Sequence, residues 1–276
     1  MINSATIRVL ATLALVLPVT LSTAAHAASC GSSGAGFGPW LANFKRQAAA
    51  QGLSQHAIGA GLDGITYDAR IVRLDRNQKS FKLSFEQFYA RRVGTALITR
   101  ARARLKTHRA TLDRVERQFG VPREIVVAIW GLETNFGADT SGKFSIIRSV
   151  ATLAYDCRRS AFFTGQLMDA LRIIDNAHMR PEELRGGWAG EIGQTQFLPT
   201  PYVRFAVDFD GDGRKDLIHS VPDVLASTAN FLKGHGWKAG QSWEPGSANY
   251  AVIKDWNRAG VYQRTIAIMA SKLAGR

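Results

Sequence analysis

The chain has 276 residues, a length that allows one or two compact domains with an ample apolar core. Its 35 Lys and Arg residues outnumber its 22 Asp and Glu residues and give a formal net charge of +13. Such a charge attracts polyanions, whether nucleic acid, anionic lipid or an acidic cell-wall polymer, although a generic solubility surface has the same composition. Beyond the first 27 residues no segment is long and apolar enough to cross a bilayer, which excludes a protein with several membrane spans.

The first 27 residues have the organisation of a secretory signal peptide. Arg8 precedes an apolar stretch over residues 9–21, and Ala25-His26-Ala27 supplies small residues at the spacing of a cleavage site. The apolar stretch is too short for a convincing membrane-spanning helix. The sequence therefore predicts an exported, periplasmic protein, which is a poor candidate for binding genomic DNA.

Two cysteines, Cys30 and Cys157, follow the predicted cleavage site. In an oxidising exported compartment, a single pair favours a disulfide over two free thiols. The alternative is that Cys30 carries a lipid and anchors the protein peripherally to the outer membrane. Ala27 stands three places before Cys30, where a lipid-attachment signal favours Leu, so we predict the disulfide.

Helical patterns dominate beyond a leader of residues 28–38, which is rich in Gly and Ser and expected to be flexible. Ser54 is a candidate cap for a short helix, and Gly94 interrupts the longest pattern. No internal repeat, alternating strand series or linker divides the remainder, so residues 39–276 are predicted to form one mainly α-helical domain. The expected longer helices span residues 40–51, 84–119, 121–132, 160–177, 221–233 and 261–273.

Glu133 stands out because it closes the apolar helical pattern of residues 121–132, VPREIVVAIWGL, with Gly137 suited to stop the helix just beyond. At helical spacing Glu133 shares a stripe with Ile129 and Trp130, where a core residue is expected. Burial and the negative end of the helix dipole both raise the pKa of a carboxyl. Such a group can hold a proton near neutral pH and act as a general acid. The alternative interpretation is a solvated Glu at a fraying helix end.

The segment 188–200, WAGEIGQTQFLPT, combines glycines with amide and aromatic side chains. Glycines permit close approach of the backbone to a ligand. Gln194 and Gln196 offer uncharged donors and acceptors, as sugar hydroxyl and acetamido groups require, while Trp188 and Phe197 offer flat apolar surface for sugar rings. A buried loop packed by its aromatic side chains is the alternative.

These two elements belong to a series of ordered blocks that resembles the B-type lytic transglycosylases of bacterial cell walls (glycoside hydrolase family 103), a lysozyme-like family acting on peptidoglycan. The resemblance extends over residues 37–272. It implies a mainly α, lysozyme-like catalytic domain with a Gly- and Gln-rich active-site loop. The most specific blocks are GLETNFG (131–137), AYDCRRSAFF (154–163), GEIGQTQFLPTPY (190–202), AVDFDGDG (206–213) and SVPDVLASTANFLKGHGW (220–237).

The resemblance implies a mechanism with one carboxylate, whereas lysozyme-type hydrolysis ordinarily uses two. Glu133 would protonate the glycosidic oxygen between N-acetylmuramic acid and N-acetylglucosamine, with the substrate's acetamido oxygen assisting. As a base, Glu133 would then deprotonate the muramyl 6-hydroxyl, which closes a 1,6-anhydro ring without consuming water. Gly187 departs from the pattern, because some members place a serine there near the catalytic carboxylate, and backbone or water would have to replace that hydroxyl.

Further site residues carry over by position. Gln196 matches the sugar-contacting glutamine of the family's GxxQF block. Arg158 and Arg159 match a basic pair lining the cleft, where guanidinium groups suit the carboxylates of stem peptides or the lactyl group. Asn257 and Tyr262 resemble the asparagine and tyrosine that a C-terminal segment contributes. A helix cap and a core aromatic are the alternatives for these two.

Acidic residues between 208 and 216 follow the spacing of an EF-hand-like loop, which suits a hard cation such as calcium. Arg214 at the seventh position would contribute only its backbone carbonyl. His219 stands at the twelfth position in place of the usual Glu, so Asp223 is the candidate for the last acidic ligand. The alternative is an acidic loop satisfied by Arg214, Lys215 and water. The residues matching positions 1, 3, 5, 6 and 9 are Asp208, Asp210, Asp212, Gly213 and Asp216.

The leading hypothesis is therefore a monomeric lytic transglycosylase acting on peptidoglycan glycan strands, with no required cofactor and a structural calcium ion at most. A hydrolytic muramidase that yields reducing ends is the enzyme alternative. A non-catalytic peptidoglycan-binding protein and a polyanion-binding protein driven by charge are the others.

Overall fold

The computed structural model describes residues 30–77, 83–140 and 142–276, so the predicted signal peptide lies outside the described residues. Within these ranges the chain forms thirteen α-helices, one short 3-10 helix and one small sheet. The prediction of a mainly α fold is confirmed. No helix in the described part of the chain combines the length and apolarity needed to cross a membrane.

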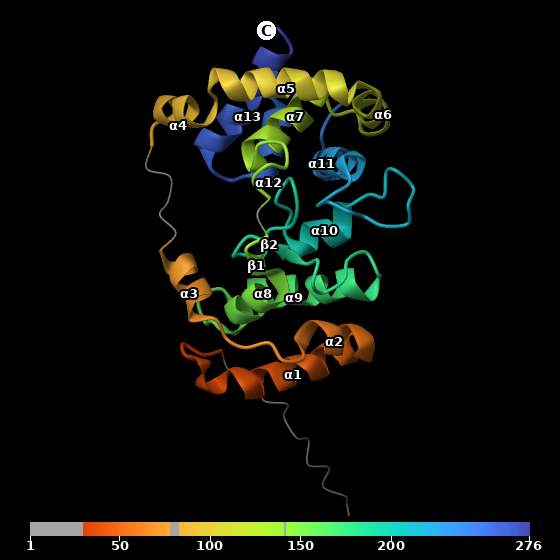
Figure 1. Ribbon diagram of the computed structural model, residues 1–276. Coiled ribbons are helices and arrows are strands. Elements are labelled where there is room, and N and C mark those ends of the chain that lie inside the picture. The colour runs from red at the N-terminus through yellow and green to blue at the C-terminus, as the bar shows by residue number, and fades with distance from the viewer. Residues whose placement is uncertain (1–29, 78–82, 141) are drawn as a thin grey trace, which may run out of the picture.

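One group of helices forms the end of the molecule that contains the N-terminal part of the described chain (Figure 1). Within it, α1 and α2 pack across α8 and α9, and α3 packs on α8. The members are η1 (Gly34–Gly36), α1 (Phe37–Ala50), α2 (Gln55–Leu62), α3 (Ala69–Arg76), α8 (Ile146–Tyr155) and α9 (Ser160–Asp175).

The second group surrounds one central helix at the opposite end of the molecule (Figure 1). The central helix is α7 (Arg123–Thr134), and α5, α6, α11 and α13 all contact it. The surrounding helices are α4 (Phe85–Arg92), α5 (Thr95–Thr107), α6 (Arg109–Phe119), α11 (Val221–Gly234), α12 (Ala248–Trp256) and α13 (Gly260–Leu273).

A short sheet and one helix lie between the two groups. Strand β1 (Phe144–Ser145) pairs antiparallel with β2 (Arg185–Gly186), and α10 (Pro199–Phe205) packs on both α9 and α11. The segment from β2 to α10 carries the Gly- and Gln-rich block. Its central place brings that block against residues from both ends of the molecule (Figure 1).

The predicted helices are all present with changed bounds, and four further helices were missed. The Ser54 side chain accepts the Ala57 N–H at 3.1 Å and caps α2, as predicted. The pattern over 84–119 breaks at Gly94, as predicted, and again at His108, where α5 ends and α6 begins. Helices α3, α8, α10 and α12 were not predicted. All residues of α8 except Arg148 are buried.

Helix α7 is buried along most of its length. Residues 125–132 are all buried, with Trp130 only 1% exposed, which is the expected state of a helix that is apolar on all faces. Gly137 was expected to stop this helix, but Asn135 does so in the left-handed conformation, with φ of 52°. Glu133 therefore lies in the last turn of a helix that the core holds rigidly.

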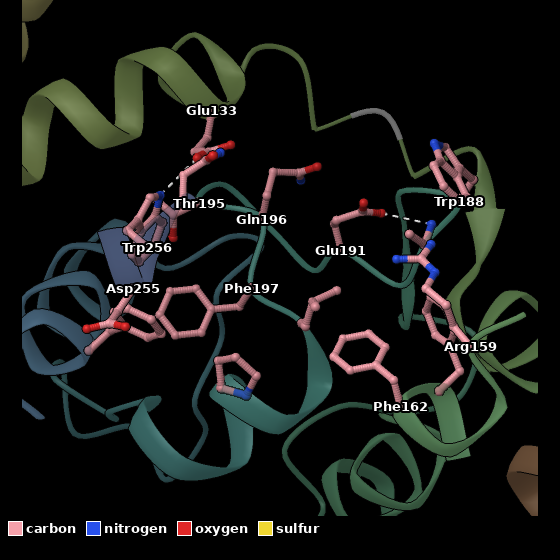
Figure 2. A pocket seen from close by; sticks show the side chains of 16 residues that line it. Glu133, Arg159, Phe162, Trp188, Glu191, Thr195, Gln196, Phe197, Asp255 and Trp256 are labelled. Carbon is pink, nitrogen blue, oxygen red and sulfur yellow. Dashed lines mark hydrogen bonds between the residues drawn. The ribbon is translucent and has the colours of Figure 1, made fainter. Parts of the chain in front are cut away.

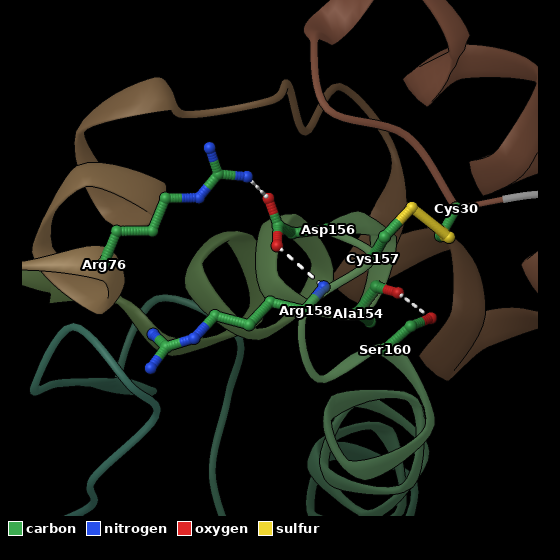
Figure 3. The surroundings of a disulfide bond; sticks show 7 residues. All are labelled: Cys30, Arg76, Ala154, Asp156, Cys157, Arg158 and Ser160. Carbon is green, nitrogen blue, oxygen red and sulfur yellow. Dashed lines mark hydrogen bonds and ion pairs between the residues drawn. A yellow bond between two sulfur atoms is a disulfide. The ribbon is translucent and has the colours of Figure 1, made fainter.

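A disulfide joins Cys30 to Cys157, as predicted, and ties the start of the described chain to the turn between α8 and α9 (Figure 3). The Gly31 N–H donates to the Tyr155 carbonyl at 2.9 Å beside it. The expected flexible leader ended at residue 38, yet α1 begins at Phe37, whose ring is buried. Residues 37–38 thus belong to α1, and residues 28–29 lie outside the described ranges.

Candidate active site

A cavity of about 460 Å³ opens where the two helical groups meet (Figure 2). Its wall consists of the end of α7, the start of α9, the loop between β2 and α10, and the end of α12, with one residue each from α10 and α11. Glu133 points into this cavity from the last turn of α7. Six aromatic side chains contribute to the rest of the wall: Phe162, Phe163, Trp188, Phe197, Phe231 and Trp256.

The Glu133 carboxyl is held by groups from two other helices. The Trp256 Nε1–H, at the end of α12, donates to Oε1 of Glu133 at 2.9 Å. The Tyr262 hydroxyl of α13 approaches the same carboxyl, is buried, and makes no hydrogen bond of good geometry with any described residue. Arg92 of α4 contributes a positive charge nearby. The carboxyl is thus oriented by one N–H donor while its cavity side stays open.

Burial is the main influence on the acidity of Glu133. The side chain as a whole is only half-buried because one side faces the cavity, whereas dense protein surrounds the rest of the carboxyl. Loss of hydration raises the pKa of Glu133 above its ordinary value, and the nearby Glu191 raises it further. The contacts with Trp256 and Tyr262 and the charge of Arg92 lower that pKa by a smaller amount. A carboxyl with a raised pKa that faces a cavity has the properties of a general acid.

The turn after Glu133 docks on the Gly- and Gln-rich loop. The Thr134 hydroxyl donates to the Gln194 carbonyl, and the Gln194 side chain accepts from Trp130 Nε1 at 2.8 Å. Gln194 Nε2 donates to the Ile218 carbonyl at 2.8 Å, and the residue is 7% exposed. We expected Gln194 to contact a sugar, but its amide is occupied by protein partners outside the cavity. Gln194 instead fixes the loop to α7.

The glycines of this loop serve packing against protein. A Cβ on Gly193 would stand 2.1 Å from the Leu217 carbonyl oxygen, and a Cβ on Gly190 would stand 2.5 Å from Val150. Both glycines have positive φ, which disfavours any side chain there. The expected close approach of the backbone is therefore to the protein's own chain.

Three other predicted residues of this loop do line the cavity. Gln196 has a left-handed φ of 56°, and its Nε2 donates to the Gly193 carbonyl at 2.8 Å. Trp188 is half-buried on the opposite wall, and Phe197 packs against Trp256 with ring centroids 5.5 Å apart. These contacts place an amide and aromatic surface beside Glu133 (Figure 2).

The predicted arginine pair divides between two environments. Arg159 lines the cavity and stacks on the ring of Phe163 at 4.8 Å. Arg158 donates to the Asp75 carbonyl at 2.5 Å and to its carboxylate at 2.6 Å, and it does not line the cavity. Asp75 of α3 is 2% exposed and also pairs with Arg159, because a buried carboxylate requires compensating charge. The expectation that both arginines line the cleft is wrong for Arg158.

Asn257 and Tyr262 have the structural roles that were the alternatives to a place in the site, a helix cap and a core aromatic residue, and both also lie near Glu133. Asn257 follows α12, its side chain accepts the Ala259 N–H at 3.0 Å, and it also lines the cavity. Tyr262 is 5% exposed in the core, and burial together with Glu133 raises the pKa of its hydroxyl well above its ordinary range. The hydroxyl is therefore neutral and able to donate a hydrogen bond.

Comparison with known proteins agrees with this geometry. A family model described as Transglycosylase SLT domain matches residues 36–247. The chain belongs to this family. The prediction of the family is thereby confirmed.

Individual relatives match to different extents. Membrane-bound lytic murein transglycosylase B of Escherichia coli (strain K12) is 41% identical over 130 residues, which are 47% of this chain and 36% of that protein. The match thus spans only about a third of the curated relative. SltB3 from Pseudomonas aeruginosa, solved with NAG-anhNAM-pentapeptide, has a TM-score of 0.81 at 30% identity, covering 89% of this chain and 80% of that chain. Escherichia coli Slt35, solved with calcium, has a TM-score of 0.74 at 23% identity, covering 85% and 92%, and shows likeness of fold alone.

The sequence predictions missed several residues of this family member's cavity, three of which have chemical importance. Glu191 and Asp255 are two further carboxylates in the wall, and Trp256 is the hydrogen-bond donor to Glu133. Glu191 stands within the block GEIGQTQFLPTPY, and Trp256 directly precedes the predicted Asn257. Glu191 had a usable signal, because a carboxylate in a glycine-rich loop at a cleft is itself a candidate for chemistry.

The acidic loop brings together part of the predicted cation site. Asp208, Asp210 and Asp212 have carboxylate oxygens within 4.8 Å of one another, a set of hard ligands that fits calcium. Arg214 turns its guanidinium away to Glu183 at 3.0 Å, so it does not neutralise the loop and its carbonyl remains the predicted contribution. The alternative of an acidic loop satisfied by Arg214 is not supported.

The two remaining predicted ligands hold the loop's backbone. Asp223 is fully buried and accepts the N–H groups of Phe209 at 2.7 Å and Asp216 at 2.8 Å. Asp216 in turn accepts the N–H of Ile218 at 2.8 Å and meets the ring of His219. Asp223 was expected to supply the last acidic ligand, but its oxygens bind loop N–H groups because a buried carboxylate needs donors.

Proposed function

We propose that this protein is a lytic transglycosylase that cleaves the β1,4 bond between N-acetylmuramic acid and N-acetylglucosamine in peptidoglycan and leaves 1,6-anhydromuramyl ends. The observation that carries the proposal is the position of Glu133, a carboxyl with a raised pKa that one tryptophan orients at the wall of a cavity lined by aromatic side chains. SltB3, the relative with a TM-score of 0.81, was solved with a NAG-anhNAM-pentapeptide, and a product of that type fits this reaction.

The proposed reaction uses Glu133 twice. Its proton passes to the glycosidic oxygen as the bond to the anomeric carbon breaks, and the substrate's acetamido oxygen stabilises that carbon. The carboxylate then accepts the proton of the muramyl 6-hydroxyl as that oxygen bonds to the anomeric carbon. Ring closure within one bound sugar has a high effective molarity, so no water is needed.

Other cavity residues have roles in binding. Phe162 is 48% exposed, and with Trp188 it offers apolar faces for sugar rings. The Arg159 guanidinium suits the carboxylate of a lactyl group or stem peptide. Gln196 and Asn257 offer amide groups to the acetamido and hydroxyl groups.

Hydrolysis by a muramidase is the second candidate, and one observation favours it. Glu191 places a second carboxylate in the same cavity as Glu133, and hydrolytic glycosidases ordinarily use two. Digestion of purified cell wall followed by mass spectrometry of the muropeptides separates the candidates. We expect anhydromuramyl ends; hydrated reducing ends from the wild-type protein would establish the muramidase instead.

A matched pair of variants tests the role of Glu133. Glu133→Gln keeps the side-chain size and an acceptor for Trp256 but has no proton to transfer, so we expect turnover to fall by about 10²–10⁴. Glu124→Gln makes the same chemical change in the first turn of α7 and should retain turnover. Near wild-type cleavage by Glu133→Gln would overturn the proposal.

We further propose export to the periplasm through residues 1–27 and a structural, non-catalytic calcium ion held by Asp208, Asp210 and Asp212. The disulfide supports an oxidising compartment. Because Cys30 forms that bond, its thiol is not available for a lipid, which supports a protein without an anchor at this residue.

A further inference from the structure

Glu191 projects into the same cavity as Glu133 from the loop between β2 and α10 (Figure 2). Its Oε2 accepts the Ala189 N–H at 3.0 Å, and the Gly187 N–H donates to its backbone carbonyl at 2.9 Å. No described cation lies within ion-pair distance of its carboxyl. The proposed reaction assigns no role to this group.

The conformation of Glu191 depends on the absence of a side chain at residue 187. A Cβ built on Gly187 would stand 2.1 Å from Oε2 of Glu191 and 2.8 Å from its carboxyl carbon. The carboxyl therefore fills the space that any other residue at 187 would occupy. Gly187 has no positive φ that requires glycine, so this space is the evident reason for glycine at this position.

The surroundings of the two carboxyls differ. Burial raises the pKa of Glu191, whereas the N–H of Ala189 and the charge of Arg159 favour its ionised form. Glu133 has more protein around its carboxyl, and a negative charge on Glu191 favours its protonated form. Two carboxyls in one site with different surroundings divide naturally into an acid and a carboxylate.

We propose that Glu191 is a second working carboxylate of the active site, ionised across the cavity from Glu133, which stabilises the positive charge that develops on the anomeric carbon and acetamido group during cleavage. This inference rests on the proposed function. Cleavage of a glycosidic bond passes through a positively charged, oxocarbenium-like state. A fixed negative charge beside the reacting sugar stabilises that state more than it stabilises the neutral substrate. The same charge keeps the proton on Glu133 until the glycosidic oxygen takes it.

The test variants leave the other charged residues around this pair unsubstituted. Arg92 and Tyr262 face Glu133, and Arg159 faces Glu191. Asp255 lines the shared cavity, and a second hollow on the far side of Glu133 is lined by Arg91, Arg92, Arg100 and Asp139.

The first experiment measures turnover of soluble, uncrosslinked peptidoglycan strands by Glu191→Gln across the pH range. We expect kcat to fall at least about tenfold with little change in KM, because the lost charge acts on the transition state. The alkaline limb of the pH profile should move to lower pH, since removing a neighbouring negative charge lowers the pKa of Glu133. Glu182→Gln, the same change at an exposed residue paired with Arg180, should retain the wild-type profile.

The second experiment uses the space at residue 187. Gly187→Ala should displace the Glu191 carboxyl and lower kcat to a similar degree. In a Glu191→Ala background the same substitution should add little further loss, because the displaced group is already gone. Thermal unfolding of each variant identifies any loss that is due to instability.

The outcomes separate this inference from the function on which it rests. If Glu191→Gln keeps the wild-type rate, or loses rate without moving the alkaline limb, the inference is wrong while Glu133 can still be the acid. Additive losses in the double variant would also contradict it. If Glu133→Gln retains activity, the proposed function itself fails.

Discussion

Substitution of Trp256 tests directly how a hydrogen bond influences Glu133, the proposed general acid. Trp256→Phe removes the N–H that meets Oε1 of Glu133 at 2.9 Å. The six-membered ring remains in the aromatic cluster, where Trp256 now packs against Phe231 at 5.0 Å and Phe197 at 5.5 Å. The substitution therefore changes the hydrogen bond more than the packing.

The size of the expected pKa shift of Glu133 follows from the charge of the acceptor. A hydrogen bond to an ionised group contributes about 1.5–3 kcal/mol, against about 0.5–1.5 kcal/mol for a neutral one. The variant thus loses about 1 kcal/mol more from the carboxylate than from the protonated carboxyl. Since the bond lowers the pKa of Glu133, its removal raises that pKa, and the alkaline limb of the activity profile should move to higher pH. Loss of orientation should lower kcat by about tenfold, equivalent to about 1.4 kcal/mol.

The assay is the pH dependence of turnover on soluble peptidoglycan strands. Trp243→Phe is the matched control, because Trp243 Nε1 donates to the Ser271 hydroxyl at 3.0 Å away from the cavity. The control should leave the profile unchanged. Trp256→Phe and Glu191→Gln should move the same limb in opposite directions. A shift of the Trp256→Phe limb to lower pH, or no shift, would refute the account of Glu133.

Three further predictions concern stability. Glu133→Gln should stabilise the fold by about 1 kcal/mol at neutral pH. Because burial raises the pKa of Glu133 above 4.5, the stability of the wild type falls as pH rises through that raised value. Urea unfolding should therefore show that the gain from the substitution vanishes below pH 4.5. Replacing Cys30 and Cys157 with Ala removes a link across 127 residues and should lower the unfolding free energy by about 2–5 kcal/mol in urea; an unchanged midpoint would contradict this. Calcium should raise the melting temperature of the wild type but not of a variant with both Asp208→Asn and Asp212→Asn, and an equal response of the two proteins would exclude this ion site.

Residues that a pattern of neighbouring residues identifies were predictable from the sequence. Glu133 was identifiable because an apolar helix pattern ends on a carboxylate, and that pattern depends only on neighbouring residues. The two cysteines were predictable as a pair for a similar reason, since the predicted export and their number sufficed. Helix α8 was missed although its polar residues Arg148 and Thr152 lie one turn apart and the Ser145 side chain caps its first turn.

The assignment of neighbouring residues to different roles was not predictable. Arg158 and Arg159 are adjacent and chemically identical, yet the buried Asp75 of α3 draws Arg158 away from the cavity. Gln194 and Gln196 are two residues apart, yet only the side chain of Gln194 accepts a hydrogen bond from Trp130 of α7. In each case the deciding partner is distant in sequence.

The sequence by itself determined which kinds of chemistry the chain can perform, because side-chain type, helix period and block order are properties of short segments. Only the tertiary structure decided which groups perform it. Burial raises the pKa of Glu133, Trp256 orients its carboxyl from more than a hundred residues away, and the missing side chain of Gly187 leaves room for a second carboxylate. Desolvation and charge act through space over a few ångströms, and the chain folding determines which groups lie within that range.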